Sequence, residues 1–202
     1  MRIGIELNGV LRDTLKKIQQ EYEKWYLNNP FRDENEEDDF KYEVISDLTS
    51  LDIMNHLKFK NKDELYDFLY KEHTMEIFGH AGSTETFTFN DFNNLYLDLR
   101  NNNDIIIVSD EIGKSKPATL FFLSKFGCLT EEIKFYSNST INSMWDKIDV
   151  LLTANPDLLL NHPENVRVIK FNTIYNQNID YVDSIDSLKE FSDKIKIKEL
   201  ND

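Results

Sequence analysis

The run Ile3-Gly4-Ile5-Glu6-Leu7-Asn8-Gly9-Val10-Leu11 decides the fold. Its first half, Ile3–Leu7, is mostly apolar on both faces, which is typical of a buried strand in a parallel sheet. Asn8-Gly9 then suits a tight turn that needs a positive φ. Glu6 and Asn8 are thus the polar side chains at the end of this strand. Ligand crevices of open α/β sheets lie at such strand ends.

Four more short apolar runs follow the first and alternate with helical patterns. The runs are Asp104–Val108, Ile133–Tyr136, Val150–Leu152 and Val166–Phe171. The helical patterns are Pro117–Phe126, Ser139–Trp145, Pro156–Leu160 and a last helix that follows Ser184-Ile185-Asp186 through Phe191. Strands that alternate with helices predict an α/β fold, a doubly wound parallel sheet of the Rossmann-like kind. Glu6, Ser109 and Thr153 should then converge at the carboxyl ends of their strands.

Residues 14–90 interrupt this alternation with helices alone. Thr14–Leu27, Leu48–Leu57 and Lys62–Phe78 have apolar residues at helical spacing, and Asn90–Leu99 forms one more helix before the second strand. The sequence therefore predicts a core of residues 1–13 and 91–202 with a helical insertion over 14–90.

Composition bounds the function. The net charge is −14, with a dense acidic run over residues 33–39, so a broad basic surface for nucleic acid is not expected. No apolar stretch reaches membrane-spanning length. The single cysteine, Cys128, excludes an internal disulfide and fits a reducing, cytoplasmic setting as a buried structural thiol. The many Asn, Lys, Asp and Ile residues suggest an AT-rich genome, such as that of a phage or a low-GC bacterium.

Glu6-Leu7-Asn8-Gly9-Val10-Leu11 resembles the first motif of the haloacid dehalogenase (HAD) superfamily, Asp-x-Asp-Gly-Val/Thr-Leu. Ile105–Ser109 resembles the second motif, and Lys114 and Lys116 stand in the region of the third-motif lysine. Asp149–Pro156 and Val168–Asn176 resemble the fourth motif and the last strand with its Tyr-Asn loop in 5′(3′)-deoxyribonucleotidase-like members. The family places its cap between the first two strands, which matches the insertion.

The resemblance implies catalytic positions that this chain has changed. In the family the first Asp takes up the phosphoryl group and the second protonates the leaving group; here Glu6 and Asn8 stand in those places. Where the fourth motif supplies metal-binding carboxylates, the chain has Thr153 and Ala154. Magnesium is normally anchored by one or two carboxylates, and Asn8 cannot donate a carboxylic-acid proton. Ser109, Lys114 and Lys116 are the phosphate contacts that the resemblance leaves.

Each of these residues also has a structural interpretation. Glu6 can be a strand-end residue hydrogen-bonded to the following turn. Ser109 can satisfy a turn amide, and the two lysines can be solvated on a loop beside Asp110-Glu111. The four histidines show no metal-binding spacing.

The leading hypothesis is a non-catalytic HAD-fold protein, with no cofactor, that binds other proteins in a homo- or hetero-oligomeric assembly, such as a phage neck, tail or capsid-associated subunit. Its partner surface is expected in Tyr22–Phe31, in the acidic run and in Gly79–Phe89, with Phe87 and Phe89. The alternative is a magnesium-dependent 5′-nucleotidase or phosphatase that uses Glu6. A third possibility is a phosphate- or nucleotide-sensing module without turnover.

Overall fold

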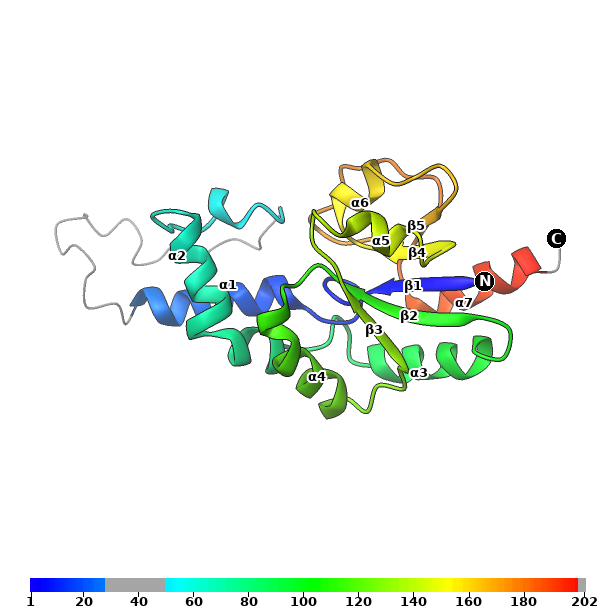
Figure 1. Cartoon of the computed structure of the whole chain (residues 1–202), viewed down its shortest axis with the longest axis horizontal. Helices are drawn as coiled ribbons and strands as arrows, with labels where there is room; N and C mark the ends of the chain where they lie inside the picture. The colour runs from blue at the N-terminus through cyan, green and yellow to red at the C-terminus, as the bar shows by residue number, and fades with distance from the viewer. Residues whose placement is uncertain (28–49, 200–202) are drawn as a thin grey trace.

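The computed structural model describes residues 1–27 and 50–199, and its centre is a single parallel sheet (Figure 1). The strand order is β3-β2-β1-β4-β5-β6, and every neighbouring pair is parallel. The strands are β1 (Arg2–Glu6), β2 (Asp104–Ser109), β3 (Glu132–Phe135), β4 (Val150–Thr153), β5 (Arg167–Phe171) and β6 (Ser184–Ile185). The five strands expected from the apolar runs are therefore confirmed, as is the α/β Rossmann-like class.

The sixth strand was not among the expected strands, and it lies in the segment Ser184-Ile185-Asp186 that precedes the last helix. Ser184 and Ile185 pair with Lys170 and Phe171 of β5, and Ile185 is buried. A two-residue strand has no periodicity of its own, so only its tertiary pairing with the edge of β5 defines it. The last helix, α7, begins at Leu188 and runs to Glu199.

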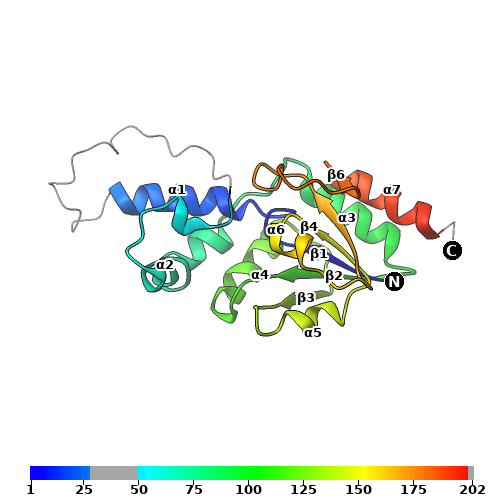
Figure 2. The same ribbon diagram turned by 90° about the horizontal axis from the view of Figure 1, so that it is seen from above.

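Helices cover both faces of the sheet (Figures 1 and 2). On one face, side chains of α3 (Thr88–Leu99), α4 (Lys116–Lys125) and α7 join Ile3, Ile5 and Ile107 in the largest apolar cluster. On the other face, α5 (Ile141–Trp145) and α6 (Pro156–Leu160) pack against Ile106, Val108 and Leu151. No described helix has both the length and the apolar character needed to cross a membrane.

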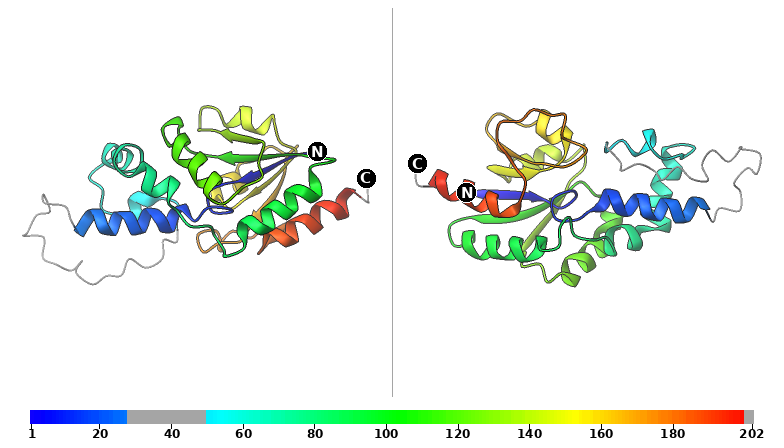
Figure 3. Two further views of the ribbon diagram at one scale, coloured as in Figure 1. Left: turned by 90° about the horizontal axis from the view of Figure 1, so that it is seen from below. Right: turned by 180° about the vertical axis from the view of Figure 1, so that it is seen from behind.

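The insertion extends beyond the carboxyl ends of the strands (Figure 3). It contains α1 (Thr14–Leu27), a 3-10 turn (Ile53–Asn55), α2 (Lys62–Asp67) and two π-helical turns (Phe68–Glu72 and Met75–Gly79). These elements share an apolar cluster with Tyr22, Phe68 and Ile77 at its centre. Ala81 and Phe89, from the last part of the segment 14–90, pack instead in the cluster beneath the sheet.

Two helices expected in the insertion differ in the structure. Leu48–Leu57 is a bend followed by the 3-10 turn over its described part, since the Ser50 hydroxyl accepts the Asp52 amide and competes with helical hydrogen bonding. Lys62–Phe78 is divided into α2 and the π-helical turns. In a continuous α-helix Ile77 would lie about half a turn away from Phe68. The wider turns let both side chains enter the same cluster.

The segments expected to bind partners differ in how far their aromatic side chains are exposed. Tyr22 is buried, and Trp25 packs against Phe68 with ring centroids 5.6 Å apart, so both contribute to the insertion's own core. Phe89 is 5% exposed and belongs to the core beneath the sheet, which removes it from any surface, whereas Phe87 is 63% exposed. The acidic run 33–39 lies outside the described residues.

Candidate functional site

The strand order reverses direction around β1, with β2 on one side and β4 on the other. Such a switch point opens a crevice at the carboxyl ends of parallel strands. Glu6 ends β1, Ser109 ends β2 and Thr153 ends β4. The pairing of Glu6 with Val108 and of Ile5 with Leu152 sets the three strand ends at the same level. The structure thus brings these three residues together, as the sequence predicts.

Glu6 is held in a buried pocket by β4. Its side chain is 1% exposed, and its Oε2 accepts hydrogen bonds from the Thr153 hydroxyl and from the Ala154 amide, the latter at 3.1 Å. Burial raises the pKa of Glu6 from 4.5 to about 8, and the nearby charge of Asp110 acts in the same direction. At neutral pH Glu6 is therefore mainly a neutral acid whose hydrogen bonds come from β4 rather than from its own turn.

Asn8 lies in a network of short hydrogen bonds. Its Oδ1 accepts from Arg12 Nη2 at 2.7 Å and from the Thr14 hydroxyl at 2.6 Å. Its Nδ2 donates to Asp110 Oδ1 at 2.7 Å. All three interactions suit an amide, which accepts at oxygen and donates at nitrogen. Asn8 is a connector between Arg12 and Asp110.

Arg12 is fully buried and forms an ion pair with Glu111. Its Nη1 also donates to the Phe78 carbonyl at 2.8 Å and to the Thr119 hydroxyl at 3.0 Å, and its Nε donates to Thr14 at 3.0 Å. The rings of Phe78 and Phe122 lie 5.3 Å and 5.2 Å from the guanidinium carbon. A buried charge of this kind is tolerated when it is paired and its donors are satisfied.

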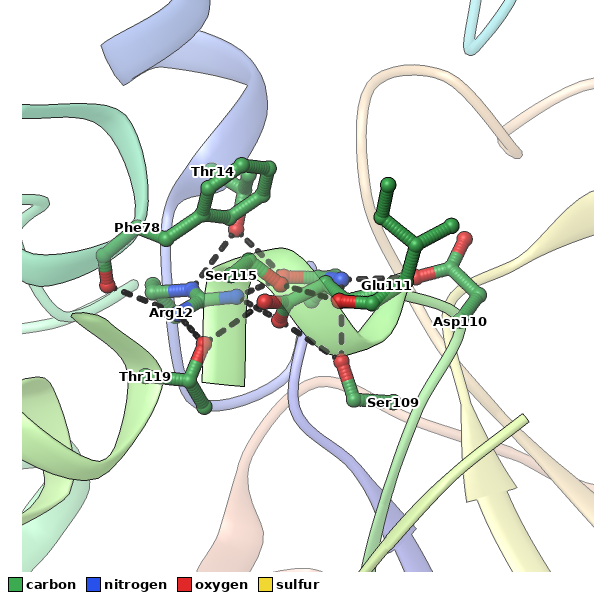
Figure 4. Close-up of polar contacts among 10 residues, drawn as sticks. Arg12, Thr14, Phe78, Ser109, Asp110, Glu111, Ser115 and Thr119 are labelled. Atoms are coloured by element: carbon green, nitrogen blue, oxygen red, sulfur yellow. Dashed lines mark hydrogen bonds and ion pairs between the residues drawn. The ribbon is translucent and has the colours of Figure 1, made fainter. Parts of the chain in front are cut away.

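Glu111 completes the network on the side of Ser109 (Figure 4). The Ser109 hydroxyl donates to Glu111 Oε1 at 2.7 Å, and the Thr119 hydroxyl donates to Oε2 at 2.6 Å. Ser109 is itself fully buried. The hydroxyl that the family resemblance assigns to phosphate therefore donates to a carboxylate of the same chain.

Lys114 and Lys116 take no part in the hydrogen bonds and ion pair of this network. Both side chains are exposed. Lys114 Nζ lies 5.1 Å from the centre of the Tyr66 ring, and Lys116 Nζ lies 5.7 Å from that of Phe135. Neither lysine lines the cavity beside Glu6. Lys116 is near the strand end of Ser109, because Phe135 pairs with Ser109, but neither lysine forms a hydrogen bond or ion pair with Glu6, Ser109 or Thr153.

A cavity of about 160 Å³ opens between the strand ends and the insertion. Its floor is polar, with Glu6, Asn8, Asp110 and Asn155, and its walls are apolar side chains of the insertion. The apolar residues are Leu15, Ile18, Leu51, Ile53, Leu69 and Phe78. The cavity is therefore built jointly by the two parts of the chain.

The positions where the family resemblance implies magnesium ligands, 6, 153 and 154, do not fit a magnesium ion. Magnesium requires a near-octahedral set of oxygens that includes carboxylates. Glu6 is mainly neutral at pH 7 and its Oε2 accepts from Thr153 and Ala154, which themselves offer a hydroxyl and a methyl group. Among the residues that the structure describes, no three His, Cys, Asp or Glu side chains gather into a metal-binding group.

The sequence did not indicate the central role of Arg12, Glu111 and Thr119. Arg12 follows the apolar pair Val10-Leu11, and a charge next to such a buried run is the signal that could have drawn attention to it. Tyr136 is another residue near the site that the sequence did not single out. It is 5% exposed, and its hydroxyl has no hydrogen-bond partner among the described residues. Burial raises the pKa of Tyr136 well above its ordinary value, and the charges of Glu6 and Asp110 add to this effect.

Comparison with known proteins identifies the fold. No protein-family profile and no curated protein sequence matches the chain. The crystal structure of a haloacid dehalogenase-like family hydrolase from Xanthomonas campestris superposes with a TM-score of 0.52 and 9% sequence identity, covering 100% of this chain and 96% of that one. At this identity the likeness concerns the fold alone, and the fold is HAD-like.

Proposed function

We propose that this chain is a non-catalytic protein with a HAD-like fold, and that it serves as a protein-binding component of an assembly. The observation that carries the proposal is the closed network of Asn8, Arg12, Ser109 and Glu111. The network satisfies these side chains internally at the place where a phosphatase of this fold would hold its substrate.

The chemistry of the strand ends supports the loss of catalysis. A nucleophilic carboxylate must be ionised, whereas burial raises the pKa of Glu6 to about 8. A general acid must present a proton, and the Asn8 amide carries none that it can transfer. The transferring phosphoryl group also needs cationic groups, and Lys114 and Lys116 are turned toward Tyr66 and Phe135.

The binding role is supported by exposed apolar side chains on the described surface, among them Phe87, Leu120 and Phe121. The partners that we propose are other proteins in a homo- or hetero-oligomeric assembly, not nucleic acid, because a net charge of −14 opposes a phosphate backbone. The Asn-, Lys-, Asp- and Ile-rich composition fits an AT-rich genome such as that of a phage, and we propose a phage virion as the specific setting.

The alternative is a magnesium-dependent 5′-nucleotidase or phosphatase. One specific observation favours it: Glu6 and Ser109 lie at the carboxyl ends of adjacent strands beside a cavity, in a fold shared with a hydrolase. In that case Glu6 would have to act as an ionised nucleophile.

Phosphate release from a panel of nucleoside monophosphates with magnesium, at pH 7 and pH 9, separates the two. We expect no release above that of the Glu6→Ala variant at either pH. Release by the wild type that Glu6→Ala abolishes would establish the enzymatic alternative. For the binding role, light scattering of the purified chain and of the chain co-expressed with its neighbouring genes should reveal a stable oligomer or complex. A monomer in both would contradict it.

A further inference from the structure

The cavity between the strand ends and the insertion is lined by acidic groups and by no basic side chain of the described residues. Its carboxyl-bearing lining residues are Glu6, which is mainly neutral at pH 7, and Asp13, Asp110 and Glu111. No Lys, Arg or His of the described residues lines it. Arg12 lies behind Asn8 and Glu111, fully buried and paired. A phosphate or carboxylate entering this cavity would meet acidic side chains and no cation.

Asp110 is the carboxylate best placed to receive a ligand. Its side chain reaches solvent, and no Lys or Arg of the described residues forms an ion pair with it. Desolvation by the surrounding atoms raises the pKa of Asp110, and a cation bound at this carboxyl group would lower it again. Asn8 Nδ2 fixes its Oδ1 at 2.7 Å, so the carboxylate is held in position from one side while it borders the cavity. A carboxylate that is oriented and accessible but unpaired favours a cation, through a charge-assisted hydrogen bond.

The Tyr136 hydroxyl is a further polar group beside the floor. It is buried and interacts with the carboxyl group of Glu6, although no hydrogen bond of ordinary geometry joins it to a described residue. Tyr136 does not line the cavity, so it adds to the polar surroundings of Glu6 and is not itself a ligand contact.

The walls define the rest of the ligand. Ile18, Leu69 and Phe78 are buried apolar residues on the insertion's side of the cavity. A void of about 160 Å³ is close to the engineered cavity of about 150 Å³ that holds benzene, so it accommodates about six heavy atoms. The ligand therefore combines a short apolar chain with a positive end.

We propose that this cavity binds an alkylammonium group, with its positive end at Asp110 and its chain between Ile18, Leu69 and Phe78. The group belongs either to a free small amine or to a lysine side chain of a partner protein. This inference goes beyond the proposed function, since a chain without an amine site would still lack the groups for phosphoryl transfer.

The test uses probes of equal size that differ in charge. Pentylamine, pentan-1-ol and butanoate each have six heavy atoms, and inorganic phosphate is the fourth probe. Binding is followed at pH 7 by NMR chemical-shift changes of the full chain. We expect pentylamine to bind about tenfold more tightly than the alcohol, because of its charge-assisted hydrogen bond. Butanoate and phosphate should not bind. Affinity should rise about fourfold for each CH₂ from ethylamine to pentylamine.

Two matched variants locate the site. Asp110→Asn should weaken pentylamine binding about tenfold and leave pentan-1-ol unchanged. Asp104→Asn removes the same charge at the other end of β2, where Asp104 is exposed, and should change neither. Equal affinity for amine and alcohol, binding of butanoate or phosphate, or no binding of pentylamine would overturn the proposal, as would equal effects of the two variants.

The source of the group is distinguished by lysine with its backbone amine acetylated and its carboxyl converted to a methylamide. Binding of this probe at the affinity of pentylamine would assign the site to a partner's lysine. Binding of pentylamine alone would assign it to a free amine. The phosphatase assay does not depend on either result. The proposed function and the proposed alkylammonium site can therefore be refuted independently of each other.

Discussion

The guanidinium of Arg12 and the carboxylate of Glu111, 99 positions apart in the sequence, form an ion pair in which both side chains are shielded from water. The exposed fractions are 0% and 2%. Arg12 comes from the turn after β1, and Glu111 comes from the loop after β2, so the pair joins the loops of adjacent strands. Because Phe78 accepts from Arg12, the pair also anchors the insertion to the sheet.

We expect either Arg12→Met or Glu111→Leu to destabilise the fold strongly. Removing one partner leaves the other charge, or its donors, buried without compensation, at a cost of about 3–5 kcal/mol. The double variant Arg12→Met with Glu111→Leu leaves Ser109 and Thr119 without their acceptor but no longer buries a lone charge. Its loss should be clearly smaller than the sum of the single losses. Urea unfolding at pH 7 measures all three, and additive losses would contradict a direct coupling.

Glu6 should make stability depend on pH. The pKa of Glu6 is raised to about 8 in the folded chain from an ordinary 4.5. Between pH 5 and 8 the folded chain therefore holds a proton that the unfolded chain has released. This contribution is complete below about pH 4.5 and is lost as pH rises toward 8, by about 1.4 kcal/mol per pH unit.

The matched variant is Glu6→Gln, in which the amide resembles the protonated acid and can still accept from Thr153 and Ala154. We expect the free energy of unfolding of the wild type to fall relative to that of Glu6→Gln between pH 5 and 8. Denaturant titrations of both chains at four pH values give this difference. Parallel curves would mean that Glu6 is ionised in the folded state.

Exchanging the amide and the carboxylate between positions 8 and 110 should destabilise the fold less than the single substitution Asn8→Asp. Asn8→Asp would set two carboxylates at a contact that is now a 2.7 Å hydrogen bond, and should cost about 1–3 kcal/mol. Adding Asp110→Asn restores a donor and an acceptor, and should recover most of that loss. Denaturant unfolding of the single and the double variant measures this recovery. No recovery in the double variant would show that repulsion between the carboxylates at positions 8 and 110 is not the reason for an amide at position 8.

The same contact bears on any attempt to restore catalysis. Replacing Glu6, Asn8, Thr153 and Ala154 with Asp is the minimum set that the sequence suggests for regaining magnesium. In the structure, Asp110 opposes a carboxylate at position 8, and Arg12 donates to position 8 from within a buried ion pair. The restored set therefore requires Asp110→Asn as well.

The sheet could be predicted from the sequence because its strands are buried on both faces. Runs such as Ile105–Val108 are apolar without alternation, and this is a local signal. The convergence of Glu6, Ser109 and Thr153 followed from parallel topology alone. The two-residue strand Ser184–Ile185 and the π-helical turns Phe68–Glu72 and Met75–Gly79 could not be predicted, because pairing with β5 and packing in the insertion define them.

The hydrogen-bond network at the strand ends could not be predicted from the sequence, because it too depends on contacts between distant residues. Two adjacent acidic residues such as Asp110-Glu111 predict a solvent-exposed segment when only the sequence is known. In the structure, however, Glu111 is 2% exposed and Arg12 is fully buried. Whether a charge is buried depends on its partner, and a partner 99 positions away leaves no local pattern. The lysines at 114 and 116 show the converse, since their positions in the sequence matched a motif while their side chains face Tyr66 and Phe135.

Gly9 should be intolerant of any side chain, for two separable reasons. Its φ is 81°, a conformation that residues with a Cβ rarely adopt, and an added Cβ would overlap the Tyr175 hydroxyl oxygen. Gly9→Ala should therefore combine backbone strain of about 1–2 kcal/mol with a steric clash. Tyr175→Phe removes the hydroxyl and with it the closest contact. We expect Gly9→Ala with Tyr175→Phe to be more stable than Gly9→Ala alone, yet less stable than Tyr175→Phe alone by the backbone strain. Thermal unfolding of the four chains completes the cycle. If Gly9→Ala costs the same stability in the wild type as in the Tyr175→Phe variant, the clash is relieved by movement of the loop, and the positive φ alone requires glycine.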